Sequence, residues 1–181
     1  MRRALFGLLP ALAGCAALSG APSLDDAQQV VAALKFPGSG APSDLTVTGN
    51  FDRPDGGYST GAPIAITVTA SEPASIAVLR VLHNGETTIV FPNKTQPDAH
   101  AANGTIRVTI PAGPEGAELF EFLAAANGGS AWIFTRKPAA PSDYADLGST
   151  TRAIITDLQT TFKGAPHGTV AVSHGAISVG G

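Results

Sequence analysis

Charge and cysteine are both scarce in this chain of 181 residues. Only 14% of the residues are charged, the formal net charge is −3, and no run of basic residues appears. Because nucleic-acid binding depends on neutralising phosphates, we expect no nucleic-acid partner. One cysteine excludes an intrachain disulfide. Nor does any group of residues have the spacing of a zinc site, so we expect neither a metal nor a cofactor.

A continuous apolar run of the roughly 20 residues that cross a bilayer as a helix is also missing. The run at residues 4–12 has nine residues and follows Arg2 and Arg3. A short basic segment before a short apolar segment is typical of a signal peptide rather than of a membrane span. We therefore expect the chain to be exported.

The apolar run ends in Leu12-Ala13-Gly14-Cys15. This sequence resembles the lipobox of bacterial lipoproteins, in which the chain is cut before the cysteine and the thiol takes a diacylglycerol. The resemblance implies that residues 1–14 are removed and that Cys15 is the lipid attachment site. Two or three acyl chains anchor a protein stably to a membrane. Ala16 favours the outer membrane over the inner one, so we expect a periplasm-facing, lipid-anchored envelope protein.

Glycine and proline are abundant, at 21 and 14 residues, which favours short strands joined by turns. Alternating apolar residues predict strands at 45–48, 64–69, 76–83, 86–91, 105–110 and 170–179. Asn84-Gly85 between two of these runs predicts a two-residue type I′ turn, with His83 opposite Glu86.

Two helices are expected, over 23–36 with Ser23 as the N-cap, and over 149–163. Residues 118–125 fit a strand or a helix, and residues 132–134 fit a short extended piece. The apolar parity changes at His174-Gly175, which indicates either a bulge or a hairpin turn.

These patterns predict a mainly β fold, an Ig-like β-sandwich of about seven short antiparallel strands with one or two accessory helices. We expect residues 15–43 to form a lipidated tether with a short helix and a linker. The sandwich domain is then expected to cover residues 44–181.

A series of motifs between Tyr58 and Ala125 resembles a known family. The motifs are Tyr58-x-x-Gly61-x-x-Ile64, Val90-Phe91-Pro92-Asn93 with Gln96-Pro97-Asp98, and Gly104-Thr105-Ile106-x-Val108-x-Ile110-Pro111. Together they resemble the bacterial domain of unknown function 4384. Members of that family occur in envelope lipoproteins and beside kinase-like or caspase-like domains. The resemblance implies an accessory or ligand-sensing module and no established activity.

The loop that carries the second of these motifs is the candidate recognition loop. Two prolines stiffen it, and Asn93 and Asp98 can accept hydrogen bonds from their own backbone in Asx turns. The loop either fixes a corner of the sheet or binds a ligand, as rigid loops on a sandwich often do. Its candidate residues are Phe91, Pro92, Asn93, Gln96, Pro97 and Asp98.

Gly57-Tyr58-Ser59-Thr60-Gly61 matches the Gly-x-Ser-x-Gly motif of α/β-hydrolases. That motif requires a helix after the serine, whereas an alternating strand follows here. We read the segment as a loop leading into a strand and expect no catalytic residues. His167 and His174 are seven residues apart without nearby carboxylates, so we read both as solvated side chains.

The sequence therefore favours a non-catalytic binding, sensing or assembly module that is held at the cell envelope and contacts an envelope protein. Two alternatives stay open. One is a small serine hydrolase that uses Ser59, and the other is a structural spacer of an envelope complex.

The lipid anchor gives the first testable prediction. Cys15→Ser should abolish acylation and cleavage before residue 15, because serine has no thiol to accept the diacylglycerol. Mass spectrometry of the N-terminal peptide from membranes measures both events. An unmodified mature N-terminus elsewhere in the native protein would show that the prediction is wrong.

Overall fold

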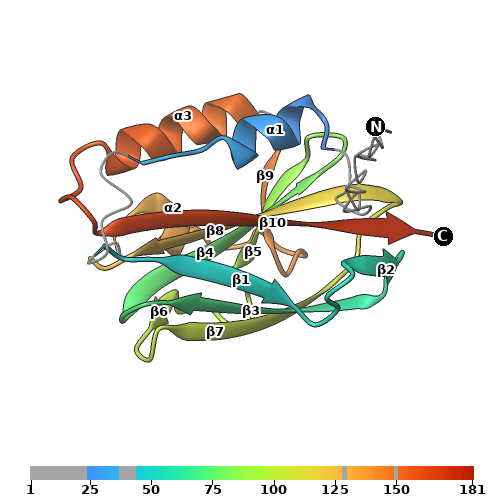
Figure 1. Ribbon diagram of the computed structural model, residues 1–181, viewed down its shortest axis with the longest axis horizontal. Coiled ribbons are helices and arrows are strands. Elements are labelled where there is room, and N and C mark those ends of the chain that lie inside the picture. Colours follow the sequence, from blue (N-terminus) through green and yellow to red (C-terminus); the bar gives the residue numbers. More distant parts are fainter. Residues whose placement is uncertain (1–23, 37–43, 128–129, 149–150) are drawn as a thin grey trace, which may run out of the picture.

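The computed structural model describes residues 24–36, 44–127, 130–148 and 151–181 (Figure 1). The predicted signal peptide, the predicted lipid attachment site at Cys15 and the predicted N-cap Ser23 lie outside these residues. In the described ranges, no helix is long and apolar enough to cross a membrane.

Ten strands in the described part of the chain form two sheets that face each other (Figure 1). The small sheet has the order β1 (Val47–Phe51), β3 (Pro63–Ala70) and β7 (Thr105–Pro111). The large sheet has the order β2 (Gly57–Ser59), β10 (Val170–Gly180), β8 (Gly116–Ala125), β4 (Ala74–Leu82), β5 (Thr87–Phe91) and β9 (Ala145–Gly148), and β6 (His100–Ala101) also pairs with β4. The prediction of a mainly β sandwich is confirmed.

Helices cover the face of the large sheet that points away from the small one (Figure 1). They are α1 (Asp26–Ala32), α2 (Trp132–Thr135) and α3 (Thr151–Phe162). Strand β8 therefore has two buried faces. Phe120 and Phe122 point into the core between the sheets, whereas Leu119 and Leu123 point into the core under the helices. Each such side chain, fully buried, stabilises the fold by about 1.5–3 kcal/mol.

Helix α1, which falls within the predicted tether, packs on the large sheet. Its N-cap is Asp25 rather than the predicted Ser23, and a capping box joins Asp25 to Gln28. The Gln28 side chain is fully buried. Its Nε2 donates to the carbonyl oxygens of Val81 at 3.0 Å and Ala117 at 2.7 Å. Hydrogen bonds from the Gln28 side chain to the backbones of β4 and β8 thus fix α1 on the large sheet.

Several details of the predicted architecture need correction. Strands β2, β6 and β9 were not predicted, because two to four residues are too few to show an alternating pattern. Three helices are described where one or two were expected, because residues 132–135 form a helical turn instead of an extended piece. The sheets are not wholly antiparallel, since β2 pairs with β10 in parallel.

Strand β10 contains neither a bulge nor a hairpin at His174-Gly175. It pairs with β8 without interruption from Val170 to Val179. The apparent change of parity arises because both faces of the strand are covered. Val170 and Val172 point toward the helices, and Ile177 and Val179 point toward the small sheet.

The hairpin between β4 and β5 forms, but its turn is not type I′. Leu82 and Glu86 pair across a three-residue loop, with the Leu82 nitrogen 2.9 Å from the Glu86 oxygen. Only Gly85 in that loop has positive φ, at 82°, as expected for a glycine that ends a three-residue hairpin loop. Consequently Val81 lies opposite Thr87, whereas a register with His83 opposite Glu86 would have placed Thr88 there.

A bulge in β5 restores the predicted register at the far end of the hairpin. The pairing shifts by one residue, so that Val78 lies opposite Phe91, as a register with His83 opposite Glu86 implies. The extra residue is Val90, and both Val90 and Phe91 belong to the core between the sheets. The bulge thus turns the chain into the loop that follows β5.

Gly85 gives the second prediction. Gly85→Val should lower the free energy of unfolding by about 1–3 kcal/mol, because a β-branched residue resists positive φ. Thermal unfolding followed by circular dichroism measures the loss. The matched control is Gly164→Val, at a site with open space and without positive φ. Equal unfolding temperatures for the two variants would contradict the assignment of strain to Gly85.

Candidate functional site

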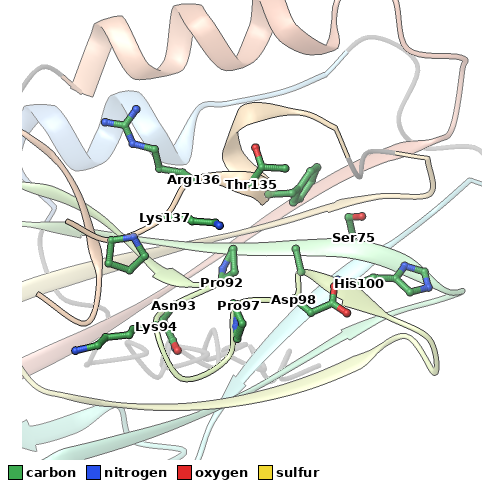
Figure 2. A pocket seen from close by; sticks show the side chains of 13 residues that line it. Ser75, Pro92, Asn93, Lys94, Pro97, Asp98, His100, Thr135, Arg136 and Lys137 are labelled. Carbon is green, nitrogen blue, oxygen red and sulfur yellow. Dashed lines mark hydrogen bonds between the residues drawn. The ribbon is translucent and has the colours of Figure 1, made fainter. Parts of the chain in front are cut away.

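A pocket lies between the loop after β5 and the end of α2 with the segment that follows it (Figure 2). Its volume is about 520 Å³, within the range of about 300–1,000 Å³ that is usual for small-molecule sites. Residues 92–100 form one wall, and residues 134–138 form the other. The two walls are far apart in the sequence and come together because α2 packs over β4.

The buried side chain of Asn93 holds the loop after β5 in shape. Its Oδ1 accepts hydrogen bonds from the Thr95 and Gln96 nitrogens at 3.0 and 2.8 Å, and from the Thr95 hydroxyl at 2.9 Å. Its Nδ2 donates to the Val90 oxygen at 3.0 Å. The Asp98 carboxylate similarly accepts from the His100 nitrogen at 2.8 Å. Both residues therefore close Asx turns, as their sequence positions suggested.

The structure brings four of the six candidate loop residues together at the pocket. Pro92, Asn93, Pro97 and Asp98 line it. The other two have different surroundings. Phe91 is buried in the core between the sheets, and Gln96 donates through Nε2 to the Arg107 oxygen at 3.0 Å, which ties the loop to β7.

The opposite wall, which the sequence reasoning missed, supplies an aromatic ring and two cations. Phe134 lines the pocket while its ring lies 6.1 Å from that of Phe162 in α3. Arg136 and Lys137 follow directly after α2 and are exposed. No local sequence pattern relates these residues to residues 92–100, because the contact is tertiary. The sequence feature that could have drawn attention to this wall is the basic pair Arg136-Lys137 after an apolar segment.

Ser59 lies in a strand-to-strand connection. It ends β2, and β3 begins at Pro63, so the helix required by a hydrolase nucleophile does not follow. Its neighbour Tyr58 is buried and donates from its hydroxyl to Asp52 at 2.7 Å. Burial and this hydrogen bond raise the pKa of Tyr58 to about 12. The motif thus anchors a short strand to the preceding turn.

The histidines are dispersed. His167 is exposed and lies 3.6 Å from the Asp44 carboxylate, and His174 is exposed on β10. His83 belongs to the three-residue hairpin loop, so its predicted pairing with Glu86 is wrong. Among the described residues, no group of three or more potential ligands could hold a metal ion.

Two buried glutamates in β8 were not singled out in the sequence. Glu118 lies 3.6 Å from Arg80, and its Oε1 accepts from the Gly113 nitrogen at 2.5 Å. Burial raises the pKa of Glu118. Because Arg80 also donates to the Pro111 oxygen at 2.9 Å, this pair fixes the connection between β7 and β8.

Glu121 is buried without a partner. It is 1% exposed, and neither carboxylate oxygen has a hydrogen-bond partner. Its position in β8 alternates with Phe120 and Phe122, so it points toward the helices; its neighbours in the sheet are Leu79 and His174. Burial raises the pKa of Glu121 to about 9, so the carboxyl is protonated at neutral pH.

Fold and pocket together define a β-sandwich that carries a ligand-sized pocket at one end of its large sheet. Residues 57–135 match the family model described as "Domain of unknown function (DUF4384)", which confirms the resemblance inferred from the motifs. The match contains the loop wall of the pocket and ends at Thr135, just before the two cations. No curated protein matches the chain.

Glu121 gives the third prediction. A carboxyl with a raised pKa in the folded state stabilises the fold fully below its unfolded value of 4.5, and this contribution is lost as the pH rises toward about 9. The free energy of unfolding should therefore fall across this window, with a limiting slope of about 1.4 kcal/mol per pH unit. Glu121→Gln should make the slope shallower, and the raised pKa of Glu118 accounts for the slope that remains.

Urea unfolding at a series of pH values measures the slopes. The matched control is Glu72→Gln, which changes an exposed glutamate and should keep the wild-type slope. Parallel profiles for Glu121→Gln and wild type would show that Glu121 is charged in the folded protein.

Proposed function

We propose that this chain is a lipid-anchored envelope protein whose β-sandwich is a non-catalytic binding module, with the pocket between residues 92–100 and 134–138 as its binding site. The observation that carries the proposal is the preorganised loop. Asn93 and Asp98 fix its backbone through hydrogen bonds within the loop. A loop that is ordered in advance loses less conformational entropy on binding.

The walls of the pocket suit recognition. Pro92, Ala99 and Phe134 are buried and offer an apolar floor. Thr135, Asp98 and His100 are exposed polar residues around it. Binding sites commonly combine mostly apolar walls with a few polar groups that orient the ligand.

Anchoring through Cys15 is supported by the order of basic, apolar and small residues before it. The chain from Cys15 to Leu24 spans at most about 30 Å when extended. An anchored sandwich would therefore stay near the bilayer, where an envelope protein or a ligand close to the membrane can reach the pocket.

A non-catalytic role is supported by the surroundings of Ser59. The serine side chain is exposed at the end of a three-residue strand. A hydrolase nucleophile needs a base within hydrogen-bond reach and backbone donors for an oxyanion. In the described part of the chain, Ser59 makes no hydrogen bond to a histidine.

Photo-crosslinking in cells is the fourth test. A benzophenone amino acid at Thr135, an exposed pocket residue, should give a discrete adduct with one ligand or protein, identified by mass spectrometry. The matched control places the same group at Gln159, an exposed position on α3. It should not give that adduct.

The same adducts from both positions, or none from Thr135, would contradict the proposed binding site. Labelling of the pure protein by a fluorophosphonate that disappears in Ser59→Ala would instead support a serine hydrolase. Recovery of the native protein in a soluble fraction, without acyl chains, would contradict the anchor.

A further inference from the structure

We infer that the pocket takes a small organic anion with an apolar body, an inference that rests on the proposed function and specifies its ligand. The first support is the charge of the pocket walls. Lys94, Arg136 and Lys137 line the pocket, against Asp98 as its one carboxylate. The chain as a whole is acidic, with a net charge of −3, so a local excess of cations is a property of this site rather than of the surface in general.

The cations are largely free to bind. Lys94 lies 3.3 Å from Asp143, but both side chains are more than 60% exposed, so solvent screens that pair. Arg136 and Lys137 form no ion pair with any described residue. A ligand anion can therefore approach both without first breaking a protein ion pair.

The charges are also separated within the pocket. Figure 2 shows Lys94, Arg136 and Lys137 on one side and Asp98 with His100 on the other. Asp98 already accepts the His100 backbone hydrogen, which fixes it at that end. An anionic group would therefore bind at the end near Lys137, with the rest of the ligand extending over the apolar floor.

That floor requires an apolar ligand body. It consists of Pro92, Ala99 and Phe134, which are held by neighbouring elements. The Ala99 oxygen accepts from the Ile76 nitrogen of β4 at 2.8 Å, and Phe134 packs on Phe162 of α3. A hydrophilic ion such as inorganic phosphate would leave this surface uncovered and would lose the free energy of apolar burial. The volume of about 520 Å³ suits one small molecule.

The test uses two probes of similar size. 8-Anilinonaphthalene-1-sulfonate carries one negative charge, and N-phenyl-1-naphthylamine is its neutral relative. Fluorescence titration gives the Kd of each, and amide chemical shifts of the full chain locate the site. We expect the sulfonate to bind more tightly, to shift residues 92–100 and 134–138, and to weaken as salt is added.

The double variant Arg136→Gln with Lys137→Gln should raise the Kd of the sulfonate, because it removes two charges that attract the anion. Solvent partly screens both charges, so we expect an increase on the order of tenfold. It should leave the Kd of the neutral probe unchanged. The matched control is Arg107→Gln with Lys163→Gln, which removes the same charge from exposed sites outside the pocket and should leave both values near wild type.

Three other outcomes would contradict the inference, and they differ in whether the binding site itself stands. Equal affinity for both probes at the pocket, unchanged in the double variant, would overturn the preference for an anion while the binding site itself stands. A lack of shifts in residues 92–100 and 134–138 with either probe would overturn both the ligand class and the pocket. An equal loss in the control variant would assign the effect to net charge alone and would also overturn the inference.

Discussion

The large sheet must be covered on both faces, and the rest of the structure follows from that requirement. Its central strands β8 and β4 bury almost every side chain, so one face needs the small sheet and the other needs a layer of helices. Helices α1 and α3 are thus part of the core rather than decoration on a sandwich. The same layer seats α2, and with it Phe134, at the end of the sheet where the pocket forms. The candidate site therefore depends on packing that lies outside the two-sheet architecture itself.

The sequence pattern predicts strands that have one solvent-exposed face, but it does not identify strands whose two faces are both buried. Strand β3 alternates between buried and exposed residues, which is the pattern that a linear reading detects. Strand β8 gives a continuous apolar run that also fits a helix. In β10, the β-branched apolar residues of the first half face the core under the helices and those of the second half face the core between the sheets. In the sequence, this change of face has the same pattern as a break in the strand. The hairpin at Asn84-Gly85 was located correctly, but the turn type was not, because the same dipeptide suits both a two-residue and a three-residue loop.

The candidate site was half predictable for a related reason. Local chemistry identified the loop wall, since Asn93 and Asp98 bond to their own backbone within three residues. The wall that contains Phe134 and Arg136 depends on tertiary contacts between α2, α3 and β4, which no local pattern encodes. Likewise Glu121 is visible in the sequence as a charge within an apolar run. Its lack of a partner follows only from the register with β4 and β10, which places Leu79 and His174 beside it.

Strand β10 has a consequence for the order in which the chain assembles. It lies between β2 and β8 in the large sheet, yet it follows both of them in the sequence, at residues 170–180. During synthesis, the edge of β8 stays unpaired until residues 170–180 have emerged, and β2 pairs with a strand more than a hundred residues downstream. Such distant pairings slow folding. An unpaired central edge also invites association with other chains. A nascent chain of this topology therefore keeps the edges of β2 and β8 unpaired until β10 has been synthesised.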